Sequence, residues 1–109
     1  MIRFKTLSKK EKLIQSLIIK KINPFIEKSK HTLNVGSYDI NPQFNNLEVS
    51  IENPTTNKKI VFGYNENNNV WCYVYLDNIN QHKPNDMYSF HYKNIFTSKR
   101  LNNSLDSII

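Results

Sequence analysis

Residues 58–76, KKIVFGYNENNNVWCYVYL, predict a β-hairpin in which two apolar strands flank an asparagine-rich turn. Successive strand residues point to opposite sides of a sheet, so the second strand presents two rows of side chains. A strand with one face in water would alternate apolar with polar residues, and this strand does not. The ring-bearing face is therefore either covered by the chain's own helices or left for a partner. The rows are Val70, Cys72, Val74 and Leu76 on one side and Trp71, Tyr73 and Tyr75 on the other.

An amphipathic helix is expected near the N-terminus, ending by Lys30. It begins with a capping box, in which Ser8 and Glu11 exchange hydrogen bonds between side chain and backbone amide. Pro24 allows either a kinked continuous helix or a break followed by a second short helix. Apolar residues at helical spacing predict one face packed on a core. These residues are Ile14, Leu17, Ile18, Ile22, Phe25 and Ile26.

Short strands are predicted after the helix, because the apolar spacing changes to two between asparagine, proline and glycine turns. A bulge is expected at Gly36, and the short connections favour an antiparallel meander. A short C-terminal helix over residues 102–109 is a further expectation, with Leu101, Leu105, Ile108 and Ile109 on its apolar side. The predicted fold is α+β: the N-terminal amphipathic helix packs on one curved antiparallel β-meander of about five strands. The strands centre on residues 32–40, 47–52, 60–64, 70–76 and 88–92.

The length of 109 residues predicts a single domain, residues 1–109. The first residues lack the apolar core of a signal peptide, and no apolar run approaches the roughly 20 residues of a membrane span. We therefore expect a cytoplasmic protein without a membrane partner. The single cysteine, Cys72, excludes an internal disulfide and lies in the aliphatic row, which predicts a buried core thiol rather than a nucleophile.

The net charge of +6 would ordinarily suggest a nucleic-acid or anionic partner. The chain has 13 lysines and 17 asparagines but two arginines and no alanine, a bias that matches an A/T-rich gene. Proteins that read phosphates and bases rely on the bidentate guanidinium of arginine. The lysine excess is thus weak support for nucleic acid, which is an alternative but not the favoured partner.

The last two predicted strands would form a patch of six rings if Tyr88, Phe90 and Tyr92 lay beside the aromatic row. Aromatic residues are enriched at binding hot spots because they bury a large area with few torsions. The alternative is that these rings form the core under the long helix, since a large exposed apolar patch promotes aggregation.

The histidines suggest one enzymatic alternative, a small basic ribonuclease that uses His82 or His91 with Lys93 and a tyrosine. Their spacing does not by itself bring them together. No two histidine, cysteine or acidic residues have a recognised metal-ligand spacing. Glu48 and Glu52 share a strand face but lie ~13 Å apart, too far to act on one bond. We therefore expect no catalytic residue, no metal and no cofactor.

The size, the composition and the layout from Ser8 to Tyr92 resemble the immunity proteins of bacterial polymorphic-toxin and contact-dependent growth inhibition systems. The resemblance implies a non-enzymatic inhibitor that binds a cognate toxin domain. Inhibitors of basic nuclease toxins are usually acidic, so either a local acidic surface makes the contact or the toxin is not strongly cationic. A single-stranded nucleic-acid module is a third alternative. The partner-binding residues on the leading hypothesis are Glu48, Glu52, Glu66, Trp71, Tyr73 and Tyr75.

Overall fold

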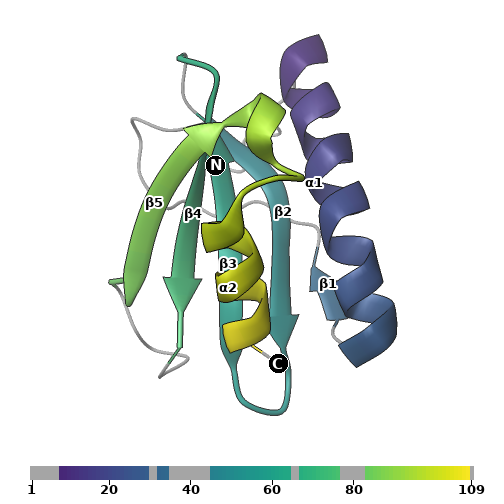
Figure 1. Cartoon of the computed structure of the whole chain (residues 1–109), viewed down its shortest axis with the longest axis vertical. Coiled ribbons are helices and arrows are strands. Elements are labelled where there is room, and N and C mark those ends of the chain that lie inside the picture. Colours follow the sequence, from purple (N-terminus) through teal and green to yellow (C-terminus); the bar gives the residue numbers. More distant parts are fainter. Residues whose placement is uncertain (1–7, 30–31, 35–44, 65–66, 77–82, 109) are drawn as a thin grey trace, which may run out of the picture.

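The chain folds into one antiparallel sheet with helices before and after it (Figure 1). The computed structural model describes residues 8–29, 32–34, 45–64, 67–76 and 83–108. Neighbouring strands pair antiparallel in the order β1-β2-β3-β4-β5, which confirms the α+β fold and the meander. The elements are α1 (Lys9–Ser29), β1 (Thr32–Asn34), β2 (Asn45–Asn53), β3 (Lys58–Tyr64), β4 (Asn69–Tyr75), β5 (Asp86–His91), the 3₁₀ turn η1 (Tyr92–Asn94) and α2 (Lys99–Ser107).

Four strands, β2 to β5, carry the sheet, rather than five of comparable length. The described part of the first predicted strand is the three-residue β1, which pairs with the outer edge of β2. The rest of that prediction, residues 35–40 with the bulge at Gly36, lies outside the described residues. A register shift instead interrupts the β2–β3 pairing between Asn46 and Ser50.

Helix α1 has the predicted capping box. The Ser8 amide donates to Glu11 Oε1 and the Glu11 amide donates to Ser8 Oγ, both over 3.1 Å. The helix runs without a break through Pro24, so the continuous form is the one adopted. Ile14, Ile18 and Ile22 are fully buried, while the rest of the apolar stripe is half-buried against the same core.

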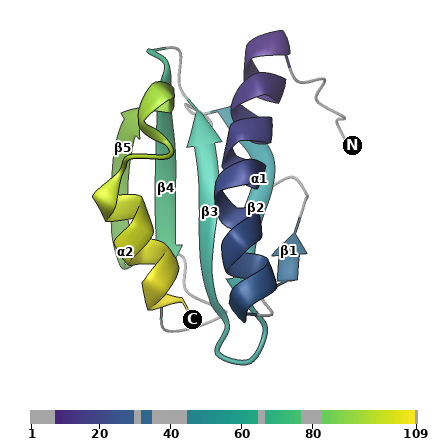
Figure 2. The same cartoon turned by 45° about the vertical axis from the view of Figure 1, so that its right-hand side comes forward.

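Both described helices lie on the same face of the sheet (Figure 2). Val70, Cys72 and Val74 of β4 are buried under them, together with Phe62 of β3. The sequence left open which row of β4 faces the helices, and in the structure it is the aliphatic row. The alternative in which the rings form the core under the helices is therefore wrong for Trp71, Tyr73 and Tyr75. It holds for Tyr88, which is buried in the main core, and for Phe90, which packs against that core.

Helix α2 begins at Lys99, earlier than the sequence predicts, because Ser98 caps it by accepting the Leu101 amide over 3.2 Å. Leu101, Leu105 and Ile108 are buried in the main core, as expected. The Asn53 side chain donates to the Ile108 carbonyl over 2.9 Å, which ties the end of this segment to the β2–β3 turn. Ile109 lies outside the described residues.

Candidate functional site

The face of the sheet opposite the helices, here called the helix-free face, carries the aromatic row of β4. The strand register places Trp71 opposite Gly63 and Ser89, and Tyr73 opposite Val61 and Met87. Gly63 has no side chain beside the indole, which leaves room for a large neighbour on this face.

A second, smaller core lies on the helix-free face. Val61, Tyr73 and Tyr75 are 1%, 3% and 8% exposed, and the half-buried Trp71 packs against them. The rings of Trp71 and Tyr73 are stacked with centroids 6.5 Å apart, and Lys59 Nζ lies 5.1 Å from the Tyr75 centroid. Burial raises the pKa of Tyr73 to about 12 and also raises the pKa of Tyr75. Tyr73 and Tyr75 are therefore buried within the helix-free face, and the residues beside them form the part of this face that solvent reaches.

The six-ring patch expected from the sequence does not form. Tyr88 pairs with Cys72 and Phe90 with Val70, so both rings point to the helix side. Tyr92 belongs to η1 and not to the strand. The strand register is the reason. It pairs odd-numbered residues of β4 with odd-numbered residues of β5, so paired residues share a side of the sheet. The rings of β4 have odd numbers and those of β5 have even numbers, so they lie on opposite sides.

The accessible part of the helix-free face is centred on three neighbours: Trp71 is half-buried, Met87 is 51% exposed and Ser89 is exposed. We call these three residues the β4–β5 surface. Sequence reasoning missed Met87 and Ser89, although pairing the strands by parity would have placed them beside the aromatic row. Two other large apolar residues are equally exposed, Leu13 at 51% on α1 and Phe96 at 52% after η1.

One of the predicted acidic contacts shares the face with the rings. Glu52 is half-buried and lies opposite Lys59, which in turn lies opposite Tyr75. Glu48 belongs to β2, but its side chain lies outside the described part of the chain, as does Glu66 altogether. Of the predicted partner-binding residues, the structure thus gathers Glu52, Trp71, Tyr73 and Tyr75 on one face.

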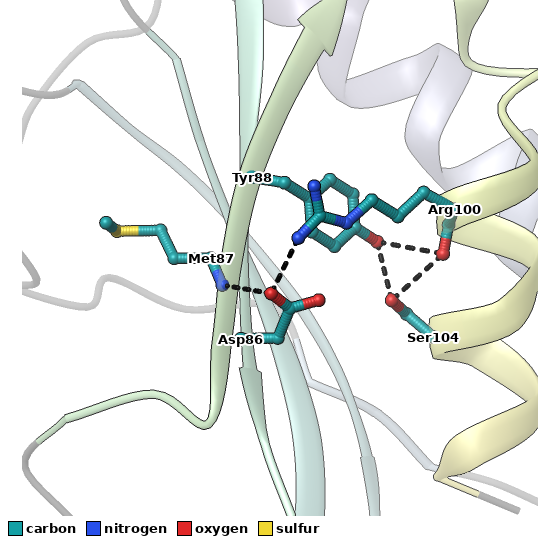
Figure 3. A network of polar contacts seen from close by, with 5 residues as sticks. All are labelled: Asp86, Met87, Tyr88, Arg100 and Ser104. Carbon is teal, nitrogen blue, oxygen red and sulfur yellow. Dashed lines mark hydrogen bonds and ion pairs between the residues drawn. The ribbon is translucent and has the colours of Figure 1, made fainter.

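A polar network fastens α2 to the outer strand β5 (Figure 3). Arg100 lies over the Tyr88 ring with its guanidinium carbon 4.4 Å from the centroid, and its Nη2 pairs with Asp86 Oδ1 at 2.8 Å. The same Asp86 oxygen accepts the Met87 amide over 3.0 Å. Tyr88 and Ser104 share a hydrogen bond of 2.7 Å between their hydroxyls. Arg100 and Asp86 are both exposed, so this ion pair joins α2 to the edge of the sheet at the surface.

His91 serves a structural role at the end of β5. Its Nδ1 accepts the Lys93 amide over 3.2 Å, and its ring stacks on Tyr92 with centroids 4.8 Å apart. A neutral imidazole that accepts at Nδ1 carries its proton on Nε2. Of the ribonuclease alternative, the structure thus places the Lys93 backbone amide and the Tyr92 ring against His91. Lys10, which is not part of that alternative, has its Nζ 5.2 Å from the Tyr92 centroid. His82, the other histidine of that alternative, lies outside the described residues.

Cys72 is the predicted core thiol: it is fully buried under the helices and forms no disulfide. Burial raises the pKa of the thiol, an effect that the neighbouring Tyr88 hydroxyl offsets in part. A buried neutral thiol is a poor nucleophile, because the thiolate is the reactive form.

Within the described ranges, no three histidine, cysteine or acidic side chains lie together as a metal-ligand set. In the same part of the chain, no helix has the length and apolar character needed to span a bilayer. Comparisons of the chain with protein-family models, with curated proteins and with solved structures found no match.

Proposed function

We propose that this chain is a non-enzymatic protein-binding inhibitor, of the kind represented by the immunity proteins that neutralise a cognate bacterial toxin by direct binding. The observation that carries the proposal is the β4–β5 surface, where Met87 and Trp71 offer apolar area on the face that the described helices leave uncovered. Tryptophan and methionine are among the residues enriched at protein interfaces relative to other surfaces.

The small core beneath this surface supports the proposal, because it holds the contact residues on a rigid sheet. The buried Tyr73 and Val61 fix the strand positions from which Trp71 and Met87 project. A surface built on strands is more precise than one built on loops, and preorganised contacts lose less entropy on binding. Glu52 and Lys59 supply charges of both signs farther along the same face, where a polar rim is expected.

Capture experiments with tagged protein in native cell lysate, after nuclease treatment, test the proposal. We expect a stoichiometric protein partner that Trp71→Ala weakens, while the variant keeps a cooperative unfolding transition. Leu13→Ala is the control, because it truncates an exposed apolar residue on α1 and should leave capture unchanged. Co-production with the captured partner should relieve the growth arrest that the partner causes alone.

Two results would contradict the proposal. One is recovery of RNA or DNA only, with affinity falling steeply as salt rises, which would favour the lysine-rich surface and a nucleic-acid module. The other is RNA cleavage by the purified protein that disappears with His91→Ala, which would favour the ribonuclease alternative.

A further inference from the structure

The register of β5 shows which of its backbone amide and carbonyl groups bond β4 and which point outward at the edge of the sheet. The Tyr92 amide donates to the Asn68 carbonyl over 3.0 Å, in line with the β4–β5 register. In an antiparallel ladder, alternate residues bond the neighbouring strand and the residues between them point away. Even-numbered residues of β5 therefore bond β4, while the amide and carbonyl groups of Met87 and Ser89 point away from it.

The contact of Asp86 with its own strand gives independent support for this phase. Asp86 Oδ1 accepts the Met87 amide (Figure 3), as expected for an amide that does not bond β4. The carboxylate is held there by Arg100. The Met87 amide is thus already bonded. The Ser89 amide and the carbonyls of Met87 and Ser89 point outward, where the groups of a further strand would bond them.

Apart from the Asp86 carboxylate on the Met87 amide, β5 itself lacks the usual devices that prevent strand addition. Natural edge strands are protected by lysine, proline, bulges or a covering element. β5 contains neither lysine nor proline, its pairing with β4 is regular from Asp86 to His91, and no described strand lies beyond it (Figure 1). Just before β5, the Asn85 amide also donates to the Val74 carbonyl over 2.8 Å, outside the even-numbered phase. Strand addition gives affinity through main-chain hydrogen bonds and specificity through alternate side chains. Met87 and Ser89 provide such side chains, because both project from the helix-free face beside Trp71.

The charge around this edge is positive. Residues 83–100 contain four cationic side chains and one acidic side chain, Asp86, which Arg100 neutralises. Three exposed lysines remain, at the two ends of β5 and at the start of α2. Repulsion between such regions disfavours a second copy of this chain as the added strand, whereas an acidic segment is attracted. These lysines are Lys83, Lys93 and Lys99.

We infer that the β5 edge is a strand-addition site for an acidic, extended segment of the protein partner. The inference rests on the proposed function and adds its binding mode. A segment of about five residues, centred opposite Ser89, would complete the ladder on the free side of β5. Its side chains on one face would extend the β4–β5 surface and contact Met87.

Amide exchange of the free protein provides the first test, because it needs no partner. The Ser89 amide should exchange at least about tenfold faster than the amides of Tyr88 and Phe90, which bond β4. A Ser89 amide as protected as that of Phe90 would show that the edge is already occupied, and would overturn the inference. In the complex with the captured partner, the Ser89 amide should become protected.

A matched pair of variants provides the second test. Ser89→Pro removes an outward amide and leaves the β4 ladder intact, since proline is tolerated on a strand where the amide faces solvent. Ser89→Ala removes the hydroxyl but keeps the amide. We expect Ser89→Pro to weaken binding of the captured partner at least about tenfold, Ser89→Ala to bind like the parent, and the parent affinity to fall with added salt.

The outcomes separate the binding mode from the function. Equal capture by Ser89→Pro and Ser89→Ala would overturn strand addition while leaving the protein-binding function in place. Failure of the parent protein to retain any protein partner would overturn both. If Ser89→Pro does not fold, as judged by its unfolding transition, protection of the Ser89 amide in the complex decides the question.

Discussion

The two faces of strand β4 come from one stretch of sequence but lie in different surroundings. On the helix side, Cys72 and Val74 lie in a core that takes residues from both helices and four strands. On the helix-free side, Tyr73 and Tyr75 form a small apolar cluster with Val61, and the buried Ser50 lies opposite Val61 on β2. Stability should therefore depend mainly on the helix side, which leaves the helix-free side available for binding.

The largest expected effect is the stability difference between the faces. Phe62→Ala removes a fully buried ring from the main core and should lower the free energy of unfolding by about 3–5 kcal/mol. Trp71→Ala removes a half-buried ring and should cost clearly less. Urea denaturation of both variants measures the difference. Equal losses would mean that the helix-free face is as important for folding as the main core.

Alkaline pH should weaken the helix side first. Burial raises the pKa of Cys72 in the folded state, so the folded protein keeps a proton that the unfolded chain releases above about pH 8.5. Stability is therefore intact below that pH and falls as pH rises, by up to about 1.4 kcal/mol for each pH unit. Tyr73 and Tyr88, whose pKa values burial also raises, should add to the loss only above about pH 10.

Cys72→Ala isolates the thiol in this experiment. The variant should lose the pH dependence between about pH 8.5 and 10 and keep the steeper loss above it. Denaturation midpoints across this range measure the slope, which is independent of the cost of the truncation itself. An unchanged slope in Cys72→Ala would assign the alkaline loss to another group.

The hydrogen bonds between β5 and α2 should have a smaller effect. Tyr88→Phe removes the hydroxyl that bonds Ser104, but Ser104 still donates to the Arg100 carbonyl over 3.0 Å. Ser104 keeps a partner and only the weakly polar Cys72 thiol loses the neighbouring hydroxyl, so the expected loss is about 1 kcal/mol. Thermal or urea unfolding checks this value. A loss of 3 kcal/mol or more would show that this network, and not the apolar packing of α2, fastens the helix.

The smallest effect on stability is expected at the edge itself. Asp86→Ala breaks an exposed ion pair and should cost about 0–1 kcal/mol, less at high salt. It also releases the Met87 amide, so strand addition at β5 should become tighter while folding barely changes. A binding titration against the captured partner checks the sign. Weaker binding by Asp86→Ala would mean that the carboxylate contacts the partner rather than occupying the edge.

Local patterns in the sequence were sufficient to predict most of the fold. The capping box of Ser8 and Glu11 and the apolar stripe of α1 depend on neighbours within one or two helical turns. The alternation of each strand is local in the same way. The point at which α2 begins was missed, because the cap at Ser98 was not recognised as a helix start.

The candidate site was only partly predictable, because it depends on pairing between strands. The rings of β4 were identified from alternation alone. Their neighbours on β5 depend on the register, and a shift of one residue would exchange Met87 for Tyr88 on the helix-free face. The sequence also did not show which face of β4 the helices cover, since both rows of β4 are apolar and α1 is compatible with either.

Affinity measurements with two matched truncations test whether the helix-free face binds the partner. Met87 and Leu13 are both 51% exposed, but Met87 belongs to the β4–β5 surface and Leu13 to α1. We predict that Met87→Ala raises the dissociation constant for the captured partner at least about tenfold, while Leu13→Ala leaves it unchanged. Equal affinities for both variants, or a loss confined to Leu13→Ala, would contradict the assignment of binding to the helix-free face.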